Sequence, residues 1–202
     1  MKYWISRNKF TVFVQTDNGT VINAAPIVTK FVGQHIGRLF CWCNKLGGLR
    51  IHKMNQWTIR FDGGIRGGNP GGIPTYGVEI KDGNGIILHT MSGIVHTEHL
   101  TNNVAEWSAL RNALAIAWMN RTEFTMLVII GDSELVIKQL TGEYSVNADH
   151  LKPLHQSCQQ ILNKLAPYHT IELHWNRREK NEEADALAEQ AHKVYIYTGG
   201  AK

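Results

Sequence analysis

The sequence has little that would mark a secreted, membrane-spanning or disulfide-bonded protein. No apolar run among its 202 residues approaches the ~18 residues that a membrane-spanning helix needs. The N-terminus lacks the apolar stretch of a secretory signal. The three cysteines cannot all pair within one chain, and Cys41-Trp42-Cys43 lacks the spacing of a C-x-x-C zinc or redox motif. These absences predict a cytoplasmic protein of a reducing compartment.

The composition is that of a folded protein. Apolar residues make up 43% of the chain, which is enough to build a core and excludes wholesale disorder. The length predicts one ordinary domain with a small addition, or two small domains.

Basic charge is concentrated at the N-terminal end. Residues 1–56 carry eight Lys or Arg against one acid, Asp17, whereas the other 146 residues carry 13 basic and 16 acidic residues. Seven aromatic residues lie among these basic ones, a combination typical of nucleic-acid surfaces. The alternative is a small domain with an aromatic core and a solvated basic face, and the alternation of Phe10, Val12 and Val14 favours core positions for several rings. Binding of nucleic acid or of a protein partner is therefore one hypothesis for this segment.

Turn signals divide the chain into two predicted domains. Residues 1–52 are expected to form a small ββαβ-like module, with a hairpin over 9–23 turning at Asp17-Asn18-Gly19 and a helix after Pro26. A short strand at 49–52 would close it, and residues 53–56 would be a junction. The second domain is expected over 57–195, followed by a C-terminal tail at 196–202.

The second domain is predicted to be α/β. Three antiparallel strands are followed by alternating helices and parallel strands, which makes a mixed sheet with helices on it. The strands are expected at 58–61, 76–80, 86–91, 125–130 and 170–175, and the helices at 104–118, 133–140, 153–165 and 182–194.

Four acids occupy the ends of these elements: Asp62, Glu106, Asp132 and Asp185. Each has a local alternative, since Glu106 can complete a capping box with Asn103, Asp132 can cap a helix, and Asp185 suits a helix N-terminus. Together they indicate more, because clustered carboxylates repel one another by several kcal/mol unless a proton or cation neutralises them. Oxygen ligands suit Mg²⁺ or Mn²⁺, and two such ions would clamp a phosphodiester.

Four sequence strings carry a family resemblance. They occur in order, and successive acids are spaced 44, 26 and 53 positions apart. The strings are Phe61-Asp62-Gly63-Gly64 with Gly68-Asn69-Pro70-Gly71, Thr101-Asn102-Asn103-Val104-Ala105-Glu106, Gly131-Asp132-Ser133, and residues 178–188. On these strings the segment from 57 to about 194 resembles the type 1 ribonuclease H family, in its plant- and archaeal-like subgroup without a basic protrusion.

The resemblance implies a ribonuclease H-like mixed five-stranded sheet flanked by helices, here preceded by the α+β N-terminal module. It implies an endonuclease that hydrolyses the RNA strand of RNA–DNA hybrids, leaving 3′-hydroxyl and 5′-phosphate ends. By that analogy the four acids hold two Mg²⁺ ions, with Asp62 shared between them and Mn²⁺ able to substitute. One ion would activate the water and the other would stabilise the departing 3′-oxygen.

The resemblance also implies a set of substrate-binding residues. Amide side chains among them are suited to reading 2′-hydroxyls, although the alternative for Asn102 and Asn103 is helix capping. The set is Gly63, Gly64, Asn69, Thr101, Asn102, Asn103 and Ser133.

Two departures from the wider family matter. Arg178 stands in the loop where many members carry a histidine, and arginine cannot shuttle protons at neutral pH, so its catalytic role would be electrostatic. The alternatives for Arg178 are a solvated charge or a salt bridge with Glu182 or Glu183.

The second departure is that no basic cluster lies between Asp132 and Asp185 to bind the hybrid. The basic N-terminal module is therefore a hypothetical hybrid-binding element.

Two other functions stay open at this point. A nuclease of the same superfamily could act on double-stranded RNA or branched DNA. A non-catalytic nucleic-acid-binding protein could use the same scaffold, although retention of all four acids argues against it.

Overall fold

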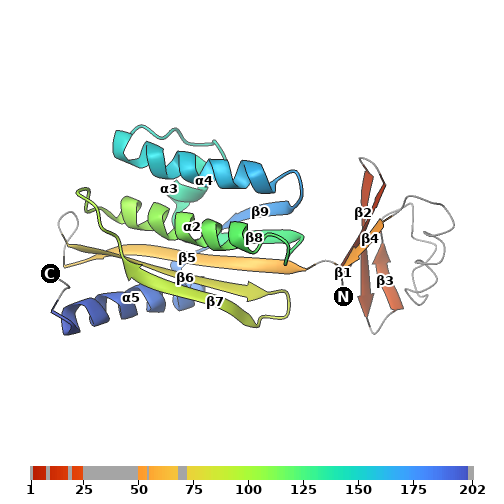
Figure 1. Cartoon of the computed structure of the whole chain (residues 1–202), viewed down its shortest axis with the longest axis horizontal. Helices are drawn as coiled ribbons and strands as arrows, with labels where there is room; N and C mark the ends of the chain where they lie inside the picture. The colour runs from red at the N-terminus through yellow and green to blue at the C-terminus, as the bar shows by residue number, and fades with distance from the viewer. Residues whose placement is uncertain are drawn as a thin grey trace. The chain divides into compact units, whose positions relative to one another are not determined.

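A computed structural model describes residues 2–7, 10–17, 20–24, 50–53, 55–67 and 72–199 of the chain. The chain divides into two compact units, Met1–Met54 and Asn55–Lys202. Figure 1 shows both units with their elements labelled. In the described part of the chain, no helix combines the length and hydropathy needed to cross a membrane.

The N-terminal unit contains a four-stranded antiparallel sheet. Its strands lie in the order β3-β2-β1-β4, and they are β1 (Lys2–Arg7), β2 (Phe10–Asp17), β3 (Thr20–Ala24) and β4 (Arg50–Lys53). Strands β2 and β3 form the hairpin expected over 9–23, and β1 is a strand that the sequence analysis did not predict. The helix expected after Pro26 lies outside the described residues.

The second unit has a mixed five-stranded sheet in the order β7-β6-β5-β8-β9. Strands β5, β6 and β7 are antiparallel, whereas β8 runs parallel to β5 and β9 runs parallel to β8. This confirms the predicted α/β architecture. The strands are β5 (Gln56–Arg66), β6 (Ile73–Asp82), β7 (Ile87–Ile94), β8 (Met126–Gly131) and β9 (Thr170–Trp175).

Helices cover both faces of this sheet. Helices α2, α3 and α4 lie on one side and α5 on the other (Figure 1). The helices are α2 (Asn102–Met119), α3 (Glu134–Leu140), α4 (Lys152–Leu165) and α5 (Glu182–Tyr197), with 3₁₀ turns η2 (Asp149–Leu151) and η3 (Arg178–Lys180). Helix α5 therefore includes residues 196 and 197, where a tail was expected.

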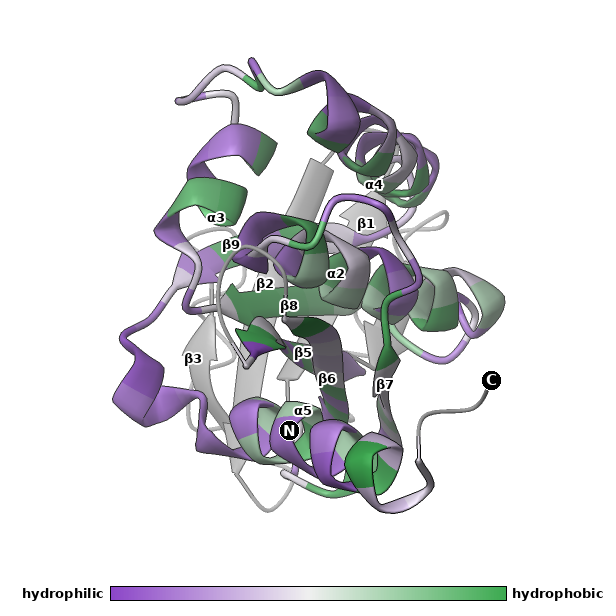
Figure 2. Ribbon diagram, turned by 90° about the vertical axis from the view of Figure 1, so that its left-hand side faces the viewer, coloured by the Kyte–Doolittle hydropathy of each residue, from purple (hydrophilic) through white to green (hydrophobic). Residues whose placement is uncertain are grey.

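The main core lies between the sheet and α2. Ile59 and Phe61 point from β5 toward α2 and are fully buried, as are Trp107, Leu110 and Leu114 on the helix. Helix α2 is buried over more of its surface than the predicted stripe, because it packs against the sheet on one side and α4 on another. Figure 2 shows β8 hydrophobic along its length, as expected for a strand covered on both faces.

Strand β5 is longer than the sequence suggested. The strand was expected to end at residue 61, but β5 continues to Arg66 and pairs with β6 throughout, with Asp62 opposite Gly77. The expectation that Asp62 follows the end of a strand is therefore wrong. The chain leaves the strand at Gly67, where φ is 87°.

Two glycines of this region serve packing rather than turning. A Cβ atom on Gly63 would lie 2.2 Å from the Ala105 carbonyl carbon of α2. A Cβ on Gly77 would lie 2.1 Å from the Ala184 carbonyl oxygen of α5. Glycine at these positions allows both helices to lie directly against the strands, which a side chain would prevent.

Candidate active site

Asp62, Glu106 and Asp132 line one pocket of about 280 Å³. The parallel pairing of β5 and β8 explains two of them, because Phe61 is opposite Gly131 and each is followed in the sequence by an aspartate. Glu106 comes from the second turn of α2, which Gly63 allows to lie against β5. The fold thus brings together three acids that are far apart in the sequence.

The fourth acid, Asp185, is bound by arginines beside this pocket and does not line it. It lies in the first turn of α5, and its Oδ1 accepts a hydrogen bond of 2.6 Å from Arg178 and one of 3.5 Å from Arg66. Within the described residues, no three His, Cys, Asp or Glu side chains are arranged as a ready-made metal site. Three of the predicted acids therefore converge, and the fourth is their neighbour in an ion pair.

The acids in the pocket hold their protons more tightly than usual. Burial, reinforced by the charges of Asp132 and Asp185, raises the pKa of Asp62 from 3.8 to about 6. Burial also raises the pKa of Glu106 from 4.5 to about 8, against an opposing hydrogen bond from Ser133. The pKa of Asp132 is raised as well, mainly by burial.

Asp185 behaves in the opposite way. Burial acts to raise its pKa, but the hydrogen bond and charge of Arg178, together with the charge of Arg66, outweigh this and lower it. Asp185 is therefore the acid that is ionised most readily, because cations already lie beside it.

The pocket suits a divalent cation chemically. Glu106 Oε2 and Asp132 Oδ1 are buried without a hydrogen-bond partner, and buried polar atoms without partners are costly. The available donors are carboxylate oxygens, which Mg²⁺ and Mn²⁺ prefer. A bound cation would supply both the missing partners and the missing positive charge.

The local alternatives for two acids do not hold. Helix α2 is capped by Thr101, whose Oγ1 accepts from the Val104 amide at 3.3 Å. Helix α3 is capped by Ser133 and not by Asp132. The suggested capping box of Glu106 with Asn103, and the suggested Asp132 cap, are therefore wrong.

The expected substrate-binding residues lie in different places. Gly63, Gly64 and Asn102 line the pocket, and Asn102 Oδ1 accepts from the Ile65 amide at 2.8 Å. Asn103 is exposed at the start of α2. Asn69 lies outside the described residues. Thr101 and Ser133 act as the caps described above.

Arg178 lines the same pocket from η3. Its ion-pair partner is Asp185, at 2.6 Å, so the expected alternative of a bridge to Glu182 or Glu183 is wrong. The hydrogen bond and charge of Asp185 raise the pKa of Arg178 further. Arg178 is thus a permanent cation directly beside the acids.

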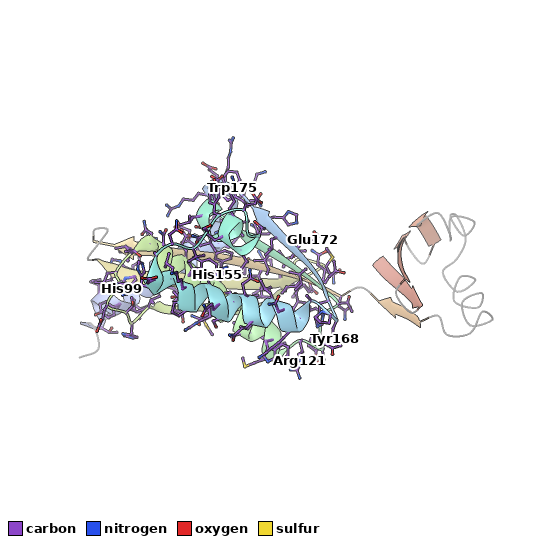
Figure 3. The ribbon with its side chains drawn as sticks, turned by 90° about the horizontal axis from the view of Figure 1, so that it is seen from above. His99, Arg121, His155, Tyr168, Glu172 and Trp175 are labelled. Carbon is purple, nitrogen blue, oxygen red and sulfur yellow. The ribbon has the colours of Figure 1, made fainter. Side chains whose placement is uncertain are left out.

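Sequence reasoning missed three residues of this site. Arg66 also lines the pocket, but it lies beyond residue 61, where the strand was expected to end. Asn181 is fully buried and donates from Nδ2 to the Phe61 carbonyl at 2.8 Å, which fixes β5 next to Asp62. Trp175 Nε1 donates to the Asp132 carbonyl at 3.0 Å, and Figure 3 shows this ring at the margin of the unit. The alignment of β9 with β8, Trp175 opposite Gly131, was the signal for this contact.

Four histidines lie between Asp132 and Asp185 in the sequence, and none of them lines the pocket. His155 packs edge-on against Trp107, and His169 packs against Phe124. The other two contact polar neighbours, with His150 stacked on His99 and His174 at 3.1 Å from Glu172.

Comparison with known proteins agrees with this architecture. The family model described as reverse transcriptase-like matches residues 60–191. Ribonuclease HI of Halobacterium salinarum is 34% identical over 131 residues, covering 65% of this chain and 61% of the relative. The chain therefore spans less than two thirds of that relative, and it spans 35% of a Mycobacterium tuberculosis relative, the bifunctional protein Rv2228c.

Solved structures show the same fold. The N-terminal RNase H domain of Rv2228c from Mycobacterium tuberculosis matches with a TM-score of 0.62 and 28% identity, covering 72% of this chain and 99% of that one. LC11-RNase H1 in complex with an RNA/DNA hybrid matches with a TM-score of 0.62 and 33% identity, covering 69% and 99%. The chain therefore belongs to the reverse transcriptase-like family, as a member of its type 1 ribonuclease H group.

Proposed function

We propose that this protein is an endoribonuclease that hydrolyses the RNA strand of RNA–DNA hybrids. The observation that carries the proposal is the pocket in which Asp62, Glu106 and Asp132 converge, with two buried carboxylate oxygens lacking partners. This pocket lies on a fold shared with a ribonuclease H solved on an RNA/DNA hybrid.

The four acids would hold two Mg²⁺ ions, with Mn²⁺ able to replace them. When bound, the ions would supply an activated water and stabilisation of the departing 3′-oxygen, which leaves 3′-hydroxyl and 5′-phosphate ends. Asp62 is the acid best placed to be shared, because β5 carries it between Glu106 on α2 and Asp132 after β8.

The residues around the acids would bind and orient the substrate. Because Asn102 Oδ1 is used by the Ile65 amide, its amide nitrogen is the end that can donate to a 2′-hydroxyl. Arg178 would attract the phosphate backbone and stabilise developing negative charge, since it is exposed, cationic and at the pocket.

The N-terminal unit would increase affinity for the hybrid. The rest of the chain carries 13 basic and 16 acidic residues, a poor balance for binding a polyanion, whereas residues 1–56 carry eight basic residues and one acid.

Substrate choice provides the test. Labelled RNA–DNA hybrid, double-stranded RNA, single-stranded RNA and duplex DNA are incubated with the protein in Mg²⁺ or in EDTA. We expect cleavage of the RNA strand of the hybrid only, dependent on the metal and abolished by Asp132→Asn. Asn147→Asp, in the loop before η2, serves as a matched control for an amide–acid exchange outside the pocket.

Two results would contradict the proposal. Preferential cutting of double-stranded RNA or of branched DNA would assign the site to another substrate. Hybrid binding without cleavage, in both Mg²⁺ and Mn²⁺, would mean that the protein is a non-catalytic binder.

A further inference from the structure

Arg66 connects the end of β5 to the first two turns of α5. Its Nε lies 3.0 Å from Glu189 Oε2, and its terminal nitrogen Nη2 lies 3.5 Å from Asp185 Oδ1. Asp185 and Glu189 are one helical turn apart, so a single guanidinium reaches both. Arg66 also lines the pocket that contains Asp62, and its side chain is only 25% exposed.

Two arginines share one oxygen of Asp185. Arg178 reaches Oδ1 at 2.6 Å from η3, and Arg66 reaches the same atom at 3.5 Å from β5. Asp185 does not line the pocket with the other three acids. The arginines therefore provide, at this acid, the positive charge that a divalent cation would provide.

The two arginines differ in what they can do after releasing Asp185. Arg178 is 64% exposed and has one acidic partner within the described residues, so release leaves it in solvent. Arg66 has a second partner, because its guanidinium also forms an ion pair with Glu189, at 3.0 Å and without a hydrogen bond. Release of Asp185 thus costs Arg66 only its longer contact.

We propose that Arg66 is a positioning residue that competes with a divalent cation for Asp185, and so sets the cation concentration at which the fourth acid joins the site. The inference rests on the proposed function, since it assumes that Asp185 is a cation ligand. Glu189 retains Arg66 when Asp185 turns to the cation.

Cation binding without nucleic acid tests this directly. Mn²⁺ is titrated into the full chain by isothermal titration calorimetry, and thermal unfolding checks that each variant is folded. Arg66→Met should bind Mn²⁺ about twofold to fivefold more tightly than wild type, the range expected for loss of one partly exposed ion pair. Arg66→Lys, which keeps the charge but cannot reach both acids, should lie between the two.

A double-mutant cycle separates the contact from the general field of the charge. In an Asp185→Asn background, Arg66→Met should no longer change the affinity for Mn²⁺. Lys193→Met is the matched control, because Lys193 pairs with Glu189 at 3.8 Å and has no described contact with Asp185. It should leave the affinity unchanged.

Several outcomes would overturn the inference. One is that Arg66→Met binds Mn²⁺ as tightly as wild type or more weakly, and another is that Arg66→Lys has the same Mn²⁺ affinity as wild type. The inference also fails if Arg66→Met increases the Mn²⁺ affinity equally in the Asp185→Asn background, or if wild type does not bind Mn²⁺. Failure of the proposed function looks different, since hybrid cleavage would then be absent while the Mn²⁺ affinities still followed the cycle.

Discussion

The buried carboxyl group of Glu106 should make the cation-free protein less stable as the pH rises. Burial is the main reason that its pKa increases from 4.5 to about 8, and the charges of Asp132 and Asp62 add to it. A group whose pKa is higher in the folded protein contributes stability that is fully present below the unfolded-state pKa. That stability is lost as the pH rises through the folded-state pKa, here between about pH 4.5 and pH 8.

The size of the effect follows from the shift. At about pH 7 the unfolded chain releases the proton of Glu106 and the folded chain keeps it, which costs folding about 3 kcal/mol. Glu106→Gln removes this cost while conserving the shape of the side chain. We expect the substitution to raise Tm by roughly 5–10 °C at about pH 8 without divalent cations, and by little at about pH 4.

Thermal unfolding in EDTA, followed by circular dichroism at three pH values, measures this difference. Glu143→Gln is the control, because Glu143 is exposed and remote from the pocket. Adding Mg²⁺ should reduce or reverse the gain, since only wild type retains the carboxylate that binds the ion. The reasoning would be refuted by a gain of the same size at about pH 4 and pH 8, or by a loss of stability at about pH 8.

Three further predictions concern other parts of the molecule. Gly63→Ala should lower the free energy of unfolding by about 3 kcal/mol or more, because its Cβ would lie 2.2 Å from the backbone of α2. Gly64→Ala should be neutral, because a Cβ at that position has no neighbouring atom within 4 Å. Equal urea midpoints for the two variants would contradict this prediction. Trp175→Phe, which loses the hydrogen bond to the Asp132 carbonyl, should reduce kcat for hybrid cleavage by roughly threefold to tenfold, and an unchanged kcat would show that the contact is dispensable. A chain of residues 55–202 should lose most of its affinity for the hybrid and most of its salt dependence in fluorescence anisotropy; unchanged binding would exclude the N-terminal unit as a hybrid-binding element.

Local sequence patterns determined the elements of the second unit. The apolar run before Asp132 identified β8, the amphipathic pattern over 104–118 identified α2, and the residues around Asp185 identified α5. Such patterns suffice because strand and helix periodicity report directly on which side chains can be buried. The four sequence strings around these acids, taken in order, were likewise enough to carry the resemblance to the family.

The ends of the elements were less predictable. Glycines at 63 and 64 resemble a turn in the sequence, yet β5 passes through them, because pairing with β6 and contact with α2 decide the conformation there. Thr101, and not Asn103, caps α2, since several adjacent residues could satisfy the same amide and only the path of the chain selects one.

The sequence by itself determined which acids this protein carries and near which helices and strands they lie, although it placed Asp62 after β5 and not within it. Only the tertiary structure decided how they are used: Asp62 and Asp132 meet through the register of β5 and β8, and Asp185 binds Arg66 and Arg178 beside the pocket. The physical reason is that charge pairing depends on distances of a few ångströms between segments far apart in the chain. No local pattern encodes those distances.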